Sequence, residues 1–238
     1  MTNFNNGTLY GIGLGPGNPE LITVKAWRLL STVEVIVYPK PPTGESLARK
    51  IAAPFIPDDV TEIAITIPMS RARKPAQDAY DDAASIIAKQ LEDGKHVAFI
   101  SNGDPFLYST FMYLHDRLKS QFEIEIIPGV TSFTASAAAT QRPLAARNDI
   151  VKILPAPLDD ETLIAEIKTG DSIVINKVGK HFPRIRQLIE KLGLVEQTQV
   201  VENASTEFEV ARPLGQIKSD DQPYFSTILI YKGHEKWR

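Results

Sequence analysis

Glycine, proline and short polar residues gather in four short loops of this 238-residue chain. The first loop, residues 13–18, reads Gly-Leu-Gly-Pro-Gly-Asn, and the others span residues 39–44, 102–105 and 128–132. Each follows a short apolar run of the kind that forms a buried strand. In an open α/β sheet, ligands bind outside the carboxyl ends of the strands, where loops present backbone N–H groups and hydroxyls. The pattern therefore predicts a ligand site at one edge of a sheet.

The first loop does not fit a dinucleotide-binding fingerprint. Such a fingerprint needs Gly-x-Gly-x-x-Gly opening a helix and an acidic residue about 20 positions further on. Here Pro16 or Asn18 stands where the third glycine is needed, and the second apolar run ends at Tyr38-Pro39 without a carboxylate. A tight turn that needs glycine for its positive φ is the simpler reading of this loop alone. An NAD-dependent oxidoreductase remains an alternative from a different class of enzyme.

The third and fourth loops also have structural readings. Asp104 and Pro105 suit the N-cap and first position of a helix. Residues 128–132 suit a turn before the alanine-rich helix expected at 134–140. The first of these readings leaves Gly103 and the neighbouring Asn102 unexplained. A binding module without catalytic activity is a further alternative, disfavoured because four such loops converge on one strand edge.

Short apolar runs alternate with segments of helical spacing, which predicts an α/β fold. Helices are expected at residues 76–93, 160–169 and 182–192. Strands are expected at residues 9–12, 33–38, 96–101, 124–127, 150–154, 172–176, 199–202 and 226–231. The first sheet should be mainly parallel, and strands after Val200 antiparallel, because no crossover helix separates them. We expect two α/β domains, residues 1–143 and 144–238, with a seam near residues 141–149.

Composition excludes several classes of function. The chain has no cysteine, so disulfides, thiolate metal sites and a cysteine nucleophile are ruled out. A net charge of -3 gives no general attraction to nucleic acid. The polar start and the lack of an apolar run of about 20 residues predict a cytoplasmic protein that does not enter a membrane. The four histidines show no ligand spacing, so no metal is expected.

Three motifs in a fixed order resemble the tetrapyrrole methylase family. They are Gly13-x-Gly15-Pro16-Gly17-Asn18-Pro19-Glu20-Leu21-Ile22-Thr23, Gly103-Asp104-Pro105-x-x-Tyr108 and Pro128-Gly129-Val130-Thr131-Ser132. The resemblance implies two α/β domains, a mainly parallel N-terminal sheet and a mixed C-terminal one, an active site in the cleft between the domains, and a homodimer. It also implies S-adenosylmethionine as methyl donor and no metal.

Further segments resemble the branch of this family that methylates C20 of precorrin-2 to give precorrin-3A in cobalamin biosynthesis. They are residues 9–13, 67–69, 108–114, 176–179 and 223–226. The chain departs from relatives at Asn102, where many have glycine or an acidic residue, and at Asn176, where the branch usually has methionine. A cobalt-sirohydrochlorin C20-methyltransferase, or another tetrapyrrole methylase, is the alternative within this fold.

The resemblance also implies the site residues. The cofactor contacts would be Pro16, Asn102, Gly103, Asp104, Leu107, Thr131, Ser132, Lys177, Ala204 and Thr227. Asp104 is the one acidic residue in the motifs and the candidate for a catalytic role. The tetrapyrrole substrate carries eight carboxylates, which need basic partners. The candidates to bind them are Arg71, Arg73, Lys74, Arg142, Arg147 and Lys180.

Overall fold

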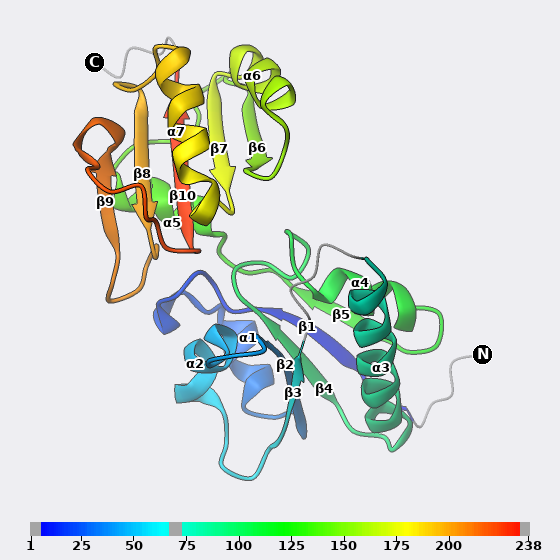
Figure 1. Cartoon of the computed structure of the whole chain (residues 1–238). Helices are drawn as coiled ribbons and strands as arrows, with labels where there is room; N and C mark the ends of the chain where they lie inside the picture. Colours follow the sequence, from blue (N-terminus) through cyan, green and yellow to red (C-terminus); the bar gives the residue numbers. More distant parts are fainter. Residues whose placement is uncertain (1–5, 67–72, 234–238) are drawn as a thin grey trace. The chain divides into compact units, whose positions relative to one another are not determined.

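The computed structural model describes residues 6–66 and 73–233, which form two compact units. One unit spans Met1–Thr131 and the other Ser132–Arg238 (Figure 1). The division therefore falls between Thr131 and Ser132, earlier than the expected seam near residues 141–149. Helix α5 (Ser132–Ala139) accounts for the difference, because it packs against β10 (Ser226–Tyr231) of the second unit.

The first unit contains a five-stranded sheet in which every pairing is parallel, as predicted. Its strand order is β3-β2-β4-β1-β5. The strands are β1 (Leu9–Gly13), β2 (Val35–Lys40), β3 (Thr61–Thr66), β4 (Val97–Ser101) and β5 (Ile124–Ile127). The expected strands are all present, and β3 was missed. It is an edge strand whose residues are mostly exposed, so it lacks the apolar run of a buried strand.

Helices cover both faces of this sheet (Figure 1). Helices α1 (Val24–Leu30) and α2 (Leu47–Ala52) pack on one face, and α3 (Arg73–Glu92) and α4 (Phe111–Leu118) on the other. Alternation along β2 shows the two faces directly. Val35 and Val37 join the core under α3 and α4, whereas Ile36 joins the core under α1 and α2. A strand buried on both faces reads as a continuous apolar run, which is why it was recognisable in the sequence.

The second unit contains a mixed five-stranded sheet, also as predicted. Its order is β6-β7-β10-β8-β9, with β6 (Val151–Pro155), β7 (Ser172–Asn176), β8 (Thr198–Glu202) and β9 (Val210–Pro213). The β6–β7 pair is parallel, while β10 runs antiparallel to β7 and β8, and β9 antiparallel to β8. The short edge strand β9, with half-exposed residues, was missed for the same reason as β3.

Helices of the second unit also lie on both faces of its sheet. Helices α6 (Asp160–Thr169) and α7 (Phe182–Lys191) pack on one face, and α5 contacts the other through Ala135. The expected helices at 160–169 and 182–192 are confirmed, the second ending one residue earlier. Four short 3-10 helices complete the described elements: η1 (Pro19–Leu21), η2 (Ala53–Phe55), η3 (Gly179–His181) and η4 (Leu214–Gln216).

One aromatic side chain ties α4 to the centre of the first sheet. Phe111 is fully buried, and its ring centroid lies 5.5 Å from that of Phe99 on β4. The ring also lies against Gly11 of β1, where an added Cβ would come within 2.3 Å of the Phe111 Cε1 atom. Glycine at this strand position therefore makes room for the ring.

Replacing Phe111 by alanine should lower the free energy of unfolding of the first unit by about 3–5 kcal/mol, because it leaves a cavity between α4 and the sheet. Urea unfolding followed by tryptophan fluorescence and circular dichroism measures this loss. Phe208→Ala is the matched control, since Phe208 is 64% exposed and its loss should change stability by no more than about 0.5 kcal/mol. Equal losses for the two variants would contradict the packing described.

Candidate active site

Three glycine loops meet at the carboxyl edge of the first sheet. Gly15 and Gly103 exchange two backbone hydrogen bonds, at 2.8 Å from Gly103 N to Gly15 O and 3.3 Å in return. A Cβ on Gly129 would lie 2.0 Å from Gly103 O, and one on Gly13 would lie 2.6 Å from Gly129 N. No side chain fits at these distances, so the loops after β1, β4 and β5 can approach each other only as glycine backbone. The predicted convergence of these loops is confirmed.

Asp104 braces two of these loops. Its Oδ1 atom accepts a hydrogen bond from Phe106 N at 2.8 Å, and its Oδ2 atom accepts one from Gly129 N at 3.1 Å. The carboxylate thus joins the loop after β4 to the loop after β5. The helix start expected at Pro105 is wrong, because the chain stays in turns until α4 begins at Phe111. Both carboxylate oxygens therefore accept charge-assisted hydrogen bonds from the backbone, which fix the position of the side chain.

Asn102 and Gly103 leave capacity for a ligand. Among the described residues, no hydrogen-bond donor reaches the buried Oδ1 atom of Asn102. Gly103 has a φ of +66°, and the one atom of the described residues within 4 Å of its notional Cβ, chain neighbours aside, is Val130 O at 3.9 Å. A buried acceptor without a donor needs a hydrogen-bond partner from outside the described residues, such as a water molecule or a ligand.

The remaining first-unit candidates lie on the same loops. Pro16 follows the bridging Gly15, Leu107 donates its backbone N–H to Asp104 O at 3.3 Å, and Thr131 follows Gly129 by two residues. All three are partly buried. The candidates of the first unit are therefore gathered at one edge of its sheet.

The second-unit candidates also share one edge of their sheet. Lys177 follows the end of β7, Ala204 follows the end of β8 by two residues, and Thr227 is the second residue of β10. Because β10 is antiparallel to β7 and β8, its start lies beside their ends. Ser132 begins α5, whose Ala135 packs against Val201 and Ala204. Lys177 has a φ of +58°, a conformation that non-glycine residues adopt mainly where the surroundings impose it.

Arg142 binds two backbone carbonyls of the second unit. Its Nη1 atom donates to Gln197 O at 2.8 Å, its Nη2 atom donates to Tyr231 O at 3.2 Å, and its guanidinium lies 5.2 Å from the centroid of the Tyr231 ring. Burial lowers the pKa of the Arg142 guanidinium. These contacts use two of the five N–H donors of the guanidinium, and substrate binding by Arg142 stays a prediction.

The other basic candidates differ in what the structure describes. Arg71 lies outside the described residues, as does the Ile67-Pro68-Met69 segment. Arg73 and Lys74 begin α3, but their side chains are outside the described part. Arg147 and Lys180 are exposed on the second unit. Substrate binding by these residues stays a prediction.

Tyr108 is a residue of the second motif for which sequence reasoning gave no role. It has a φ of +54° while 42% of it is exposed. The following Ser109 holds this turn in place, because its Oγ atom lies 2.9 Å from Ser101 Oγ and accepts a hydrogen bond from Phe111 N at 3.2 Å. A bulky residue held at positive φ is an outlier whose strain the surrounding bonds must maintain. Sequence spacing gave no signal of this conformation.

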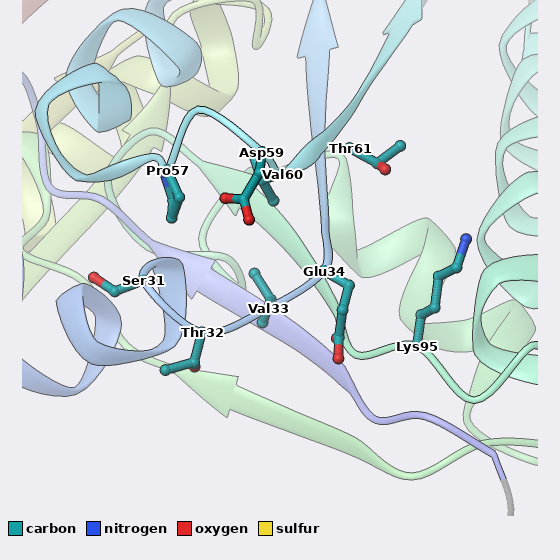
Figure 2. Close-up of a pocket in the computed structure, with 9 residues that line it drawn as sticks. All are labelled: Ser31, Thr32, Val33, Glu34, Pro57, Asp59, Val60, Thr61 and Lys95. Atoms are coloured by element: carbon teal, nitrogen blue, oxygen red, sulfur yellow. The ribbon is translucent and has the colours of Figure 1, made fainter.

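A hollow lies at the opposite, amino-terminal edge of the first sheet (Figure 2). It measures about 340 Å³ and lies among the turns that precede β2, β3 and β4. Two of its charged groups already serve the fold: Glu34 accepts a hydrogen bond from His96 N at 2.9 Å, and Lys95 donates one to Gln90 Oε1 at 3.0 Å. None of the residues that line the hollow belongs to the motif loops.

Residues 6–66 and 73–233 contain no group of three or more His, Asp or Glu side chains placed to hold a metal ion. Within the same residues, no helix has both the length and the apolar character needed to cross a membrane.

Solved structures share this fold. Cobalt precorrin-4 methyltransferase CbiF has a TM-score of 0.72 at 23% identity, with 94% of each chain covered. The uroporphyrin-III C-methyl transferase of Thermus thermophilus, solved in complex with S-adenosylhomocysteine, has a TM-score of 0.66 at 23% identity, covering 94% of this chain and 97% of that one.

Relatives in sequence match nearly the whole chain. Cobalamin biosynthesis protein CobIJ of Mycobacterium tuberculosis is 36% identical over 97% of this chain, which spans 47% of that relative. The cobalt-precorrin-2 C(20)-methyltransferase of Salmonella typhimurium is 34% identical, with 97% of this chain and 98% of the relative covered. The precorrin-2 C(20)-methyltransferase of a Sinorhizobium species is 30% identical, with 97% of both covered.

The motif loops that meet at the first sheet lie within the part of the chain, residues 8–217, that matches a single family of proteins. The relatives and the shared fold agree with that match. The chain belongs to the tetrapyrrole (corrin/porphyrin) methylases.

Proposed function

We propose that this protein is an S-adenosylmethionine-dependent methyltransferase that methylates C20 of precorrin-2 to give precorrin-3A in cobalamin biosynthesis. The observation that carries the proposal is the nearly end-to-end similarity to relatives named for C20 methylation. The chain spans about half the length of the CobIJ proteins, so that similarity alone does not define the whole activity. The glycine loops support the proposal because they combine open space with an unsatisfied acceptor.

The residues of the first unit fit S-adenosylmethionine, which supplies an activated methyl group on a sulfonium. Gly103 has no side chain to block a ligand from its loop. The Asn102 Oδ1 atom has no donor among the described residues, so it can accept a hydrogen bond from a ligand. Asp104 keeps the two loops at a set distance through its bonds to Phe106 N and Gly129 N. Rigid loops of this kind contribute to methyl transfer by orienting the reacting groups, an effect worth on the order of 7–11 kcal/mol for well-placed pairs.

The chain does not need to supply a strong base. The ring carbon loses a proton after it gains the methyl group, and solvent or a substrate carboxylate can accept it. We therefore assign Asp104 to loop positioning, since both of its oxygens accept backbone hydrogen bonds. The basic residues around Arg71, Arg147 and Lys180 remain the proposed partners of the eight substrate carboxylates, and a homodimer remains the expected assembly.

The relatives named for metal-free and for cobalt-containing precorrin-2 match this chain at similar identities, 30% and 34%. A cobalt-sirohydrochlorin C20-methyltransferase is therefore the second candidate. Both candidate activities would use the same glycine loops, because the methyl donor is the same. The metal state of the substrate is what distinguishes them.

Methyl transfer should occur to C20 of a precorrin-2-type ring. The purified protein is incubated with labelled S-adenosylmethionine and either precorrin-2 or cobalt-sirohydrochlorin, and the product is located by mass spectrometry and NMR. We expect turnover of precorrin-2 to exceed that of the cobalt form. Faster turnover of the cobalt form would select the second candidate, and methylation at another carbon would overturn the C20 assignment.

Ligand titration separates a methyltransferase from an oxidoreductase. Calorimetry and thermal-shift measurements should detect binding of S-adenosylhomocysteine and no binding of NAD(H), because the first loop lacks the third glycine and the acidic residue of a dinucleotide site. Tight NAD(H) binding without S-adenosylhomocysteine binding would refute the proposed function.

Gly103→Val should weaken S-adenosylhomocysteine binding roughly 10-fold to 100-fold, because the branched side chain would fill the open space beside Asn102. Strain at positive φ should also cost about 1–3 kcal/mol of stability. Gly193→Val is the matched control, since Gly193 has a φ of +69° and no atom of the described part of the chain lies within 4 Å of its notional Cβ. It should lose similar stability and keep its affinity. Normal affinity in Gly103→Val would remove this loop from the binding site.

A further inference from the structure

A hydrogen bond between two hydroxyl groups closes the base of the loop that follows β4. Ser101 is the last residue of β4, and its Oγ atom lies 2.9 Å from the Oγ atom of Ser109. Residues 102–108, with Gly103 and Asp104 of the second motif, lie between the two serines. Ser101 is 3% exposed, so water competes little for this bond. The contact therefore fixes the two ends of the loop relative to each other.

Ser109 also caps helix α4. The first N–H groups of a helix have no partner within the helix, and the side chain of Thr110, the N-cap residue, makes no capping hydrogen bond. Ser109 Oγ accepts the hydrogen bond of Phe111 N instead, at 3.2 Å. Phe111 is fully buried against the first sheet. Ser109 thus ties the loop to a helix end that the core holds in place.

The loop requires such a restraint because Tyr108, its last residue, has a φ of +54°. A bulky residue at positive φ is strained, and the strain persists only where neighbouring contacts maintain it. Ser109 directly follows Tyr108, so its two contacts act on this turn. Without them Tyr108 would relax toward a negative φ, and the preceding residues of the loop would move with it.

The two hydroxyls of this clamp are not equivalent. Ser109 Oγ contacts both Ser101 Oγ and Phe111 N. Among the described residues, Ser101 Oγ makes its hydrogen bond with Ser109 alone. Removing the Ser109 hydroxyl therefore breaks two interactions, whereas removing the Ser101 hydroxyl breaks one.

We propose that Ser109 is a positioning residue for the methyl donor. Through Ser101 and Phe111 it keeps residues 102–108 in the conformation that receives S-adenosylmethionine before the ligand arrives. The inference rests on the proposed function and adds a restraint at the base of the loop to the one that Asp104 provides within it. A loop that is already ordered reduces the entropic cost of binding. Loss of the clamp should therefore weaken binding of the donor and leave the chemical step unchanged.

The test measures steady-state kinetics of Ser109→Ala and Ser101→Ala with S-adenosylmethionine and precorrin-2. In Ser109→Ala the KM for S-adenosylmethionine and the Kd for S-adenosylhomocysteine should rise about fivefold to tenfold. The kcat and the KM for precorrin-2 should stay within about twofold, as expected when only binding of the donor is lost. Ser101→Ala should show a smaller rise, about twofold to threefold, because Ser109 still caps α4. The double variant should bind no more weakly than Ser109→Ala, since the shared bond is lost only once.

Thr198→Val is the matched control. Thr198 is fully buried at the start of β8 in the second unit, and its Oγ1 atom donates to Leu194 O at 2.6 Å. The variant removes a buried hydroxyl hydrogen bond outside the motif loops, so it should lower the Tm and leave both KM values unchanged.

A lower kcat with an unchanged KM for the donor in Ser109→Ala would indicate only a loss of folded protein and would overturn the inference. If Ser109→Ala does not fold, the KM of Ser101→Ala decides, and an unchanged value there also overturns it. Either result leaves the methyltransferase proposal intact. Failure of the wild-type protein to bind S-adenosylhomocysteine would instead reject the proposed function itself.

Discussion

The close approach of three backbone segments at the carboxyl edge of the first sheet is the constraint on which the candidate site depends. Gly13, Gly103 and Gly129 come so near each other that one added Cβ would lie 2.0 Å from a carbonyl oxygen. That contact is possible because β1 lies between β4 and β5 in the sheet, so the loops that follow these strands emerge side by side. The parallel strand order thus turns three separated sequence motifs into one surface.

Polar contacts then hold this surface in a single arrangement. Asp104 joins two loops through backbone donors, and the Ser101–Ser109 contact secures the turn that carries Tyr108 at positive φ. A loop fixed in this way loses little conformational freedom when a ligand binds, which reduces the entropic cost of binding. The same hydrogen bonds show how Asp104, the acidic residue of the motif, connects the loop after β4 to the loop after β5.

The second unit brings residues that are distant in sequence together through a mixed sheet. The antiparallel β10 brings its own start next to the ends of β7 and β8, so Thr227 lies near Asn176 although 51 residues separate them in sequence. Helix α5 contacts this face through Ala135 and Ala139, whose small side chains let the sheet lie close to the helix backbone. Arg142 contributes to the other end of this sheet by binding the carbonyls of Gln197 and Tyr231.

Local pattern in the sequence determined the buried strands, the longer helices, the parallel and mixed character of the two sheets, and the glycine loops. Those features depend on periodicity and on backbone conformation, which neighbouring residues encode. The edge strands β3 and β9 escaped because half-exposed residues break the apolar run. Only the tertiary structure decided that Asp104 meets Gly129, that Arg142 donates to two backbone carbonyls, and that α5 belongs with the second sheet. It also decided that no donor within residues 6–66 and 73–233 reaches the Asn176 Oδ1 atom. Each of these depends on which distant residue supplies a hydrogen-bond partner or a packing surface, and the spacing of residues along the chain does not contain that information.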